Sequence, residues 1–154
     1  MELKFSHIDI LVKDLQTACN YYQKIFNAQI SKTFTWIRED LHVVYAVVKT
    51  GTEYFMLVQP LSGNLKNLLD LKGEGTIYRH CYSTPNIEKA FDQLTANGVM
   101  PEDENGNPIA KHQLDSPSGV RIIWLPKRFG GFSIEILEEH GLRVFMQEAF
   151  QENK

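Results

Sequence analysis

The chain has 154 residues, of which 43% are hydrophobic and 23% charged, and its formal net charge is −3. This composition fits one globular domain, and the small negative charge argues against nucleic acid or an anionic membrane as the main partner. No apolar run is long enough to span a bilayer. The N-terminus lacks a signal-peptide pattern, and two cysteines indicate neither a disulfide framework nor a cysteine zinc site. We therefore expect a cytoplasmic protein.

The first predicted strand covers residues 5–12. Side chains alternate along a strand, so its isoleucines share one face while His7 and Asp9 share the other. A helix should follow, because Asp14 is a good N-cap and apolar residues recur after it at helical spacing. Three strands are then predicted at residues 29–36, 41–49 and 53–60.

The second half of the chain shows the same order of elements. Residues 61–75 form a linker whose leucines predict a short helix. A strand then carries His80 between Tyr78 and Tyr82, and Asn86 caps the next helix, which should stop at Gly98. After a turn-rich section at 102–108, strands are predicted at 112–115, 120–125 and 131–138.

The two halves are in register. His7 and His80 are separated by 73 residues, and the caps Asp14 and Asn86 by 72. We therefore predict a single α+β domain, residues 1–154, made of two tandem βαβββ modules. Their expected limits are about 5–60 and about 76–139, followed by a C-terminal helix at 140–151. An apolar stripe on that helix predicts either packing on its own domain or a dimer contact; it comprises Leu142, Phe145, Met146, Ala149 and Phe150.

Glu135 interrupts an apolar strand, and a charge in such a strand is costly unless it is paired or bound to a metal. Together with His7 and His80 it gives two histidines and one carboxylate on three different strands. These three side chains could hold one metal ion. The alternative is that Glu135 pairs directly with a protonated histidine.

The chain resembles the vicinal oxygen chelate superfamily, which contains glyoxalases, bleomycin-resistance proteins and extradiol dioxygenases. The likeness lies in a duplicated module with a histidine in the first strand of each half and Glu135 in the last strand. The segments 6–15, 57–63 and 73–75 look most like the branch of the methylmalonyl-CoA epimerases and glyoxalases. The resemblance covers roughly residues 5–139, and it implies sheets that curve around a cavity with a metal between the modules.

The resemblance implies a divalent metal ion (Fe, Co, Mn, Ni or Zn) bound by His7, His80 and Glu135. The remaining ligand position falls on Met56, where epimerases and glyoxalases carry Gln or Glu. A thioether is a poor ligand for hard or borderline ions. Met56 is therefore the main departure from the family pattern.

The implied function is that of a metal-dependent lyase or isomerase acting on a small organic or acyl-CoA substrate through an enolate-like intermediate. Glu135 and Glu39 are the candidate catalytic residues, and Asp40 is an alternative to Glu39. The other interpretation is that Glu39 and Asp40 simply lie in a solvent-exposed loop. Other possibilities are an extradiol-type Fe(II) dioxygenase and a metal-free, resistance-type binding protein.

The expected partners are a small-molecule substrate and a second copy of the chain in a homodimer. The substrate pocket should be lined by Tyr54, Met56, Tyr78 and Tyr82. Arg79 and Arg121 could anchor a carboxylate or a coenzyme A phosphate, or could simply be solvated. Cys81 is expected on the opposite face of its strand from His80, in the core. The remaining histidines are interpreted as surface or edge residues: His42, His112 and His140.

Overall fold

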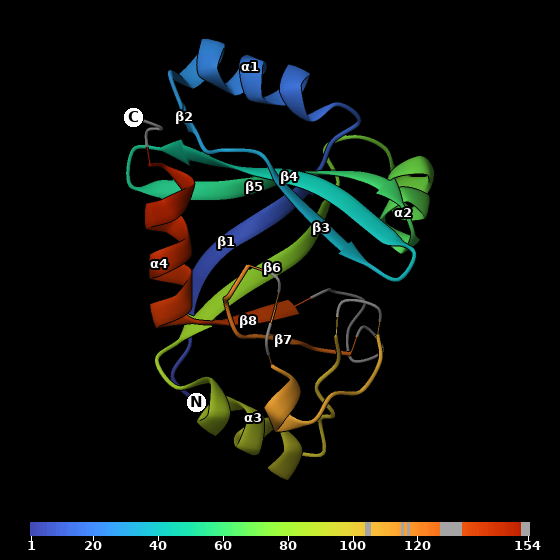
Figure 1. Cartoon of the computed structure of the whole chain (residues 1–154), viewed down its shortest axis with the longest axis vertical. Coiled ribbons are helices and arrows are strands. Elements are labelled where there is room, and N and C mark those ends of the chain that lie inside the picture. The colour runs from blue at the N-terminus through green and yellow to red at the C-terminus, as the bar shows by residue number, and fades with distance from the viewer. Residues whose placement is uncertain (104–105, 115, 117, 127–133, 152–154) are drawn as a thin grey trace. The chain divides into compact units, whose positions relative to one another are not determined.

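The computed structural model describes residues 1–103, 106–114, 116, 118–126 and 134–151. Within these ranges the chain forms eight strands, four α-helices and one 3-10 helix, and so confirms the predicted α+β class. It divides into two compact units (Figure 1). Unit 2 contains residues 7–78 and 149–154, and unit 1 contains residues 1–6 and 79–148. No helix in the described ranges has the length and apolarity needed to cross a membrane.

Unit 2 holds most of the first repeat. Its strands are ordered β2-β4-β5-β1, with β3 paired to β4. β5 runs parallel to β1 and antiparallel to β4. The elements are β1 (Lys4–Leu11, which starts in unit 1), α1 (Leu15–Phe26), β2 (Gln29–Ile30), β3 (Phe34–Arg38), β4 (Leu41–Thr50), β5 (Glu53–Ser62) and α2 (Asn64–Lys72).

The predicted strand at 29–36 is in fact two strands, β2 and β3. Ser31 separates them, and its hydroxyl accepts the N–H of Val47 at 2.8 Å while its own N–H donates to the Val47 carbonyl. This side-chain hydrogen bond takes a main-chain partner from the regular ladder, as serine hydroxyls often do. The expected helix in the linker is present as α2.

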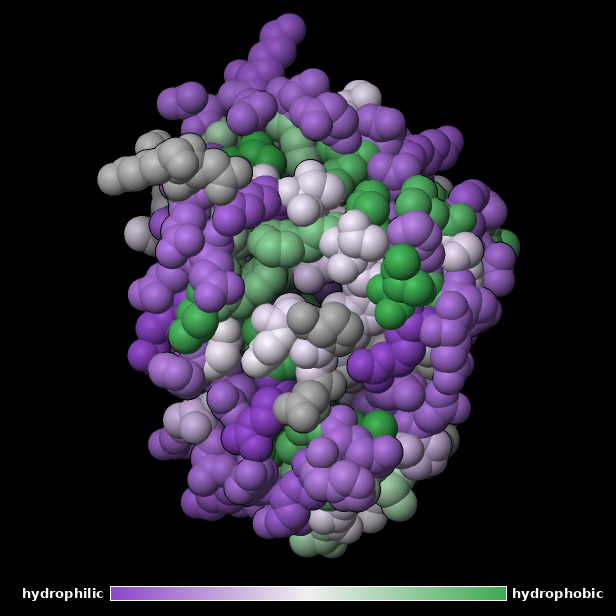
Figure 2. All heavy atoms as spheres, in the orientation of Figure 1, coloured by the Kyte–Doolittle hydropathy of each residue, from purple (hydrophilic) through white to green (hydrophobic). Residues whose placement is uncertain are grey.

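The core of unit 2 lies between α1 and the strands (Figure 1). α1 begins at the predicted place, because the Asp14 carboxylate accepts the N–H of Thr17 at 2.8 Å. The buried core residues are Val12, Leu15, Cys19, Ala28, Ala46, Val48 and Leu57. In Figure 2 the hydrophobic side chains visible on this face gather mainly over the strands of unit 2, and hydrophilic residues surround them.

Burial of Cys19 in this core should suppress its reactivity. Burial raises the pKa of the Cys19 thiol, so at any given pH less thiolate is present than in an exposed cysteine. We expect alkylation by iodoacetamide at pH 8 to be at least about tenfold slower in the folded chain than in urea. Peptide mass spectrometry after timed labelling measures both rates, and equal rates would contradict the packing of α1.

Unit 1 holds most of the second repeat. Its strands are ordered β6-β8-β7, with β8 parallel to β6 and antiparallel to β7. Glu102 forms isolated bridges to Pro108 and to Trp124. The elements are β6 (Ile77–Thr84, whose first two residues are in unit 2), α3 (Ile87–Ala96), η1 (Lys111–Gln113), β7 (Ile122–Trp124) and β8 (Ile134–Glu138). The first part of the predicted strand 131–138 lies outside the described residues.

The predicted strand at 112–115 is wrong over its described residues. Residues 111–113 form the 3-10 helix η1. The N–H of Gln113 donates to the Ala110 carbonyl at 2.9 Å, and the Gln113 side chain accepts the N–H of Ala110 at 2.8 Å. These two local bonds close a tight turn, which the alternation of apolar residues did not reveal.

The C-terminal helix is α4 (Glu139–Ala149), one residue earlier than expected at its start. Leu142, Phe145 and Ala149 are buried within the single chain. The carbonyl of Ala149 accepts the N–H of Lys32 at 3.1 Å in unit 2. These observations confirm that the stripe packs on its own chain, while the homodimer stays a prediction.

The core of unit 1 packs under α3 and depends on its cap. The Asn86 side chain accepts the N–H of Lys89 at 3.0 Å, and Gly98 follows the helix with φ +78°. The buried residues are Ile87, Ala90, Phe91, Leu94, Leu114, Ile123 and Ile136. Both helix ends are therefore where the sequence predicts them.

The cap can be tested by substitution. Asn86→Ala should lower the free energy of unfolding by about 1 kcal/mol, because the first turn of α3 loses the acceptor for an N–H group. Asn86→Asp keeps an acceptor and should be nearly neutral. Urea titration followed by circular dichroism measures both changes, and equal losses in the two variants would mean that the cap contributes nothing.

Candidate functional site

A buried histidine and a buried aspartate lie next to each other on one face of β1. His7 Nε2 is 3.3 Å from Asp9 Oδ1, and the two residues are 1% and 3% exposed. Their positions i and i+2 follow from strand alternation. The opposite face of β1 carries Ile10, which packs with the α1 core. His7 and Asp9 therefore face away from α1.

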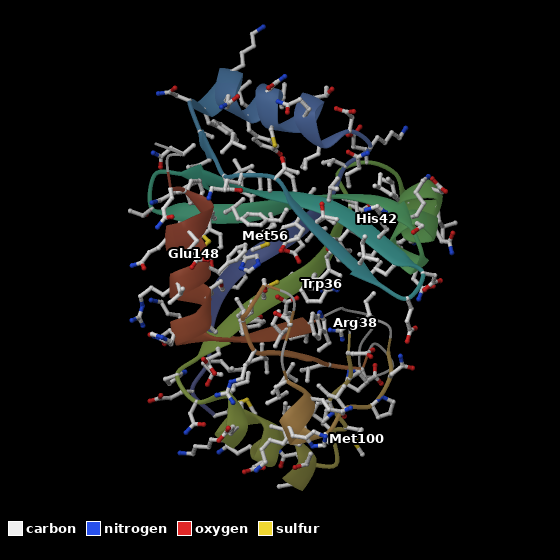
Figure 3. All side chains as sticks on the ribbon, in the orientation of Figure 1. Trp36, Arg38, His42, Met56, Met100 and Glu148 are labelled. Atoms are coloured by element: carbon white, nitrogen blue, oxygen red, sulfur yellow. The ribbon has the colours of Figure 1, made fainter. Side chains whose placement is uncertain are left out.

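Neighbouring strands extend this face. Asp9 is paired with Met56 of β5, and Met56 is paired with Val47 of β4. The ring of Tyr54 lies 5.1 Å from the ring of His7. Figure 3 shows Met56 and Trp36 on the side of the unit 2 strands away from α1. Tyr54 and Met56, two of the predicted pocket residues, thus share a face with the His7–Asp9 pair.

The register of β6 and β8 separates His80 from Glu135. His80 is paired with Ile134, whereas Cys81 is paired with Glu135. Ile136, two residues from Ile134, packs in the α3 core. His80 therefore lies on the α3 side of the sheet, and Cys81 lies beside Glu135 on the other side. The expectation that His80 would join Glu135 does not match this register. Cys81 faces away from His80 and is buried, as expected.

Glu135 is partnered by an arginine. Arg79 Nη1 is 3.2 Å from Glu135 Oε2, and the two side chains are only 12% and 7% exposed. The Arg79 guanidinium also lies over the ring of Trp124 at 5.7 Å, and Trp124 is paired with Glu135 across β7 and β8. The charge that the sequence shows inside an apolar strand is thus balanced by a buried cation.

The two repeats align through their helix caps and strand partners. The cap spacing of 72 residues matches His7 with Arg79 and Asp9 with Cys81. The strand partners agree, because Asp9 is paired with Met56 and Cys81 with Glu135. Arg79, not His80, is therefore the counterpart of His7. The cap spacing was the sequence signal that could have identified it.

Two of the four positions matched by the repeat carry side chains that are poor metal ligands. His7, Cys81 and Glu135 are buried side chains of a type that binds metals. The counterparts of His7 and Glu135, however, are Arg79 and Met56. A guanidinium carries donors only and cannot coordinate a cation, and a thioether is a soft ligand. Glu135 is also already engaged by a positive charge.

The other predicted residues are more dispersed. Tyr78 and Tyr82 alternate with Cys81 and so lie on the His80 face; Tyr82 contacts Phe5, with ring centroids 5.8 Å apart. Glu39 is exposed at the tip of the β3–β4 hairpin and has φ +54°. Its role as an acid–base group stays a prediction, as does that of its exposed neighbour Asp40.

Arg121 is held in a surface ion-pair network. Hydrogen bonds to Glu88 and Glu138 raise the pKa of Arg121 above its usual range. Both carboxylates belong to unit 1, as Arg121 does. The Arg121 charge is therefore largely neutralised by residues of its own unit. His112 and His140 are exposed, as expected, and His42 is half-buried on β4.

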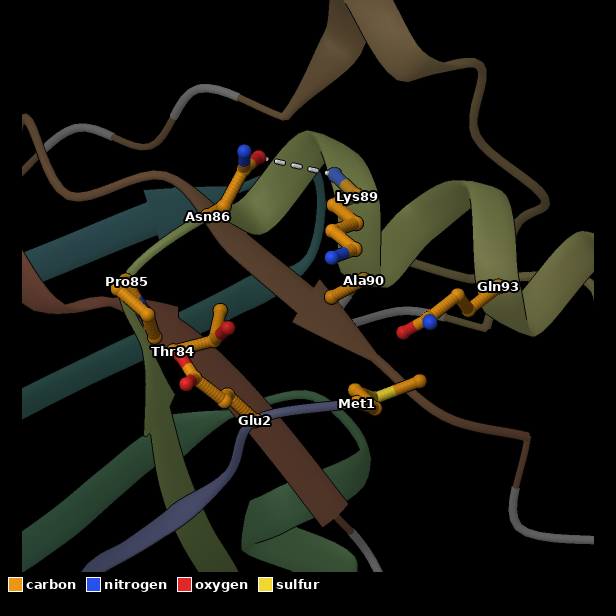
Figure 4. Close-up of a pocket in the computed structure, with 8 residues that line it drawn as sticks. All are labelled: Met1, Glu2, Thr84, Pro85, Asn86, Lys89, Ala90 and Gln93. Atoms are coloured by element: carbon orange, nitrogen blue, oxygen red, sulfur yellow. Dashed lines mark hydrogen bonds between the residues drawn. The ribbon is translucent and has the colours of Figure 1, made fainter.

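A pocket of about 290 Å³ lies beside the start of α3 in unit 1 (Figure 4). It contains none of the predicted site residues. The Lys89 N–H at this helix start, which could otherwise face an anion, is already taken by the Asn86 side chain. The lining residues are Met1, Glu2, Thr84, Pro85, Asn86, Lys89, Ala90 and Gln93.

The family model described as the Glyoxalase/Bleomycin resistance protein/Dioxygenase superfamily matches residues 4–123. Two curated relatives are mitochondrial methylmalonyl-CoA epimerases. The mouse (Mus musculus) protein is 24% identical over 136 residues, which cover 86% of this chain and 71% of the relative. The human (Homo sapiens) protein is 26% identical, with coverages of 86% and 72%.

Solved structures share the fold. A hypothetical protein from Bacillus halodurans C-125 superposes with a TM-score of 0.70 at 20% identity, covering 90% of this chain and 96% of its own. Methylmalonyl-CoA epimerase from Mycobacterium tuberculosis gives a TM-score of 0.69 at 20% identity, with coverages of 87% and 86%. A variant epimerase from Streptomyces coelicolor, in complex with 2-nitronate-propionyl-CoA, gives 0.65 at 17% identity, with coverages of 88% and 96%.

The Arg79–Glu135 pair should be important for stability. Arg79→Met leaves a buried carboxylate without its cation and should lower the free energy of unfolding by about 3 kcal/mol. The double variant Arg79→Met with Glu135→Leu removes both charges and should recover most of that loss. Urea titrations of the single and double variants form a thermodynamic cycle. A double variant that is less stable than Arg79→Met would contradict the pairing.

Proposed function

Because the chain belongs to the Glyoxalase/Bleomycin resistance protein/Dioxygenase superfamily, we propose that it is an epimerase-type isomerase of a small acyl-CoA. Its reaction moves the proton on the carbon next to the thioester carbonyl. The methylmalonyl-CoA epimerases among its curated relatives support this class of substrate. We take 2-substituted acyl thioesters, with methylmalonyl-CoA as the first to test, as the substrate class.

The buried His7–Asp9 pair is the observation that carries the proposal. A carbon acid needs a base that is held close and shielded from water. An imidazole beside a carboxylate can accept a proton and return it, and the carboxylate stabilises the charged imidazolium. The neighbouring side chains of Tyr54 and Met56 give this face the largely apolar surface that an acyl group needs.

The proposed reaction has two proton transfers. The pair formed by His7 and Asp9 accepts the proton from the carbon, and the C–H electron pair moves into an enolate whose negative charge rests on the thioester oxygen. A proton from solvent then returns to the opposite face of that carbon, which inverts its configuration, and the imidazolium releases its proton to solvent. Glu135 is an ionised partner of Arg79 and is assigned no transfer, so its catalytic role stays a prediction. Glu39 receives no step in this proposal.

Isotope exchange tests the proposal directly. Protein in D₂O should introduce one deuterium at the carbon next to the thioester of methylmalonyl-CoA, and mass spectrometry follows the gain of mass. His7→Gln and Asp9→Asn should each slow the exchange by about 10²-fold or more, because each removes a member of the proton-transfer pair. His112→Gln changes an exposed histidine and should leave the rate unchanged.

Two results would count against an isomerase. The first is the absence of exchange above the buffer rate across a panel of 2-substituted acyl-CoA thioesters. The second is exchange that proceeds equally well in His7→Gln, since the buried pair would then have no part in it. Circular dichroism of each variant confirms that a loss of exchange does not come from unfolding.

A binding protein without chemistry is the second candidate. The Arg79–Glu135 pair favours it, because these positions carry an internal ion pair in place of a complete set of metal ligands. Calorimetry with propionyl-CoA and with the anionic analogue 2-nitronate-propionyl-CoA distinguishes the candidates: tight binding of either without deuterium exchange indicates a binder. Oxygen consumption with Fe(II) and a catechol tests the dioxygenase alternative.

A further inference from the structure

We propose that the pocket beside the start of α3 binds a small α-amino acid, whose ammonium group donates to Gln93 and whose carboxylate pairs with Lys89. All of the lining residues belong to unit 1, whereas the His7–Asp9 pair of the proposed isomerase belongs to unit 2. The pocket volume of about 290 Å³ lies just below the roughly 300–1,000 Å³ that is usual for ligand sites. This size suits a small metabolite rather than a large cofactor.

A helix and the end of a strand meet at this pocket. Lys89, Ala90 and Gln93 recur along one side of α3, because residues three and four apart share a helix face. Thr84 is the last residue of β6. Figure 4 shows the side chains of Lys89 and Gln93 extending from α3 to the side of the helix on which Thr84 and Met1 lie. Regular secondary structure therefore directs several polar groups at one small volume.

The side-chain oxygen of Gln93 is buried and lacks a partner. No donor in the part of the chain that the structure describes forms a hydrogen bond with it. Burial of a carbonyl oxygen without a donor is costly, and native proteins almost always supply one. A ligand N–H group in the pocket would provide the missing donor. Gln93 therefore favours a ligand that carries an ammonium group.

Thr84 adds a second buried polar group to the lining. The residue is only 2% exposed, and no described residue forms a hydrogen bond with its hydroxyl. A threonine hydroxyl is both a donor and an acceptor, so it can donate to a carboxylate oxygen. Two buried groups that need partners, on two different elements, indicate a polar ligand and not an apolar one.

The charges of the lining favour a ligand with both signs of charge. Lys89 contributes a cation and Glu2 a carboxylate, and neither forms an ion pair within the described ranges. One charge of each sign suits a zwitterion better than a phosphate, because the carboxylate repels an ion that is only negative. Met1, Pro85 and Ala90 add apolar surface for the side chain of an amino acid such as leucine.

Calorimetry with three probes tests the class of ligand. L-leucine carries both charged groups, 4-methylpentanoate lacks the ammonium, and 3-methylbutylamine lacks the carboxylate. L-leucine should bind with a Kd of about 1 mM or below. Each of the other two probes should bind at least about tenfold more weakly, because each loses one charge-assisted hydrogen bond. Equal affinity for the three probes, or tighter binding of inorganic phosphate, would overturn the proposal.

Substitutions test whether leucine occupies this pocket. Thr84→Val and Gln93→Met roughly keep the size of the side chain and remove its polar group, so each should weaken leucine binding about tenfold. Lys89→Gln removes the cation and keeps the main-chain N–H that Asn86 caps, and it should weaken binding about threefold or more. Lys24→Gln is the matched control, because it changes an exposed lysine of α1 and should leave the affinity unchanged.

The stability of the variants separates loss of binding from loss of folding. Neither buried substitution breaks a hydrogen bond between described side chains, so both variants should unfold at a urea midpoint no lower than that of the unsubstituted chain. If one of them fails to fold, the three probes and Lys89→Gln still decide. Absence of leucine binding up to about 10 mM, or binding that is unchanged in all three variants, would overturn the site.

Deuterium exchange in methylmalonyl-CoA reports on the proposed function separately. Exchange without leucine binding would overturn the amino-acid site and leave the isomerase supported. Leucine binding without exchange would support the site and count against the isomerase.

Discussion

The need to neutralise a buried carboxylate governs the unit 1 face of the sheet. Glu135 lies in a strand whose neighbours are buried, and removing a charged carboxylate from water is costly unless a partner compensates. Arg79 provides that partner from the adjacent strand, and its guanidinium also lies over the ring of Trp124.

The duplicated framework explains why such different side chains occupy equivalent positions. In each repeat the first and last strands run parallel and in register, with Asp9 beside Met56 and Cys81 beside Glu135. Main-chain hydrogen bonds hold this register whichever side chains it carries. The same register therefore accommodates different side chains on the face away from the helix. One repeat carries a buried histidine and aspartate on this face, and the other carries an arginine and a glutamate that form an ion pair.

This difference between the side chains of the two repeats is compatible with the family relationship at low identity. Curated relatives that are epimerases share about a quarter of their residues with this chain, whereas the solved structures are similar mainly in fold. A fold of this kind hosts several reactions, and its function depends on the side chains placed on the strands. In this chain the buried polar or charged residues on those strands include His7, Asp9 and Glu135, and the family pattern indicated His7 and Glu135.

Local sequence signals were sufficient for the α+β class, for the duplication and for most elements. The caps Asp14 and Asn86 and the glycine after α3 act within a few residues, so they can be recognised without the fold. Local signals failed where a side chain competes with the main-chain ladder, as at Ser31 and Gln113. The pairing of strands, which depends on residues far apart in the chain, decided which side of the sheet each residue faces. A shift of one residue moves a side chain to the other face, so the 73-residue match of histidines suggested His80 while the register placed Arg79 against Glu135.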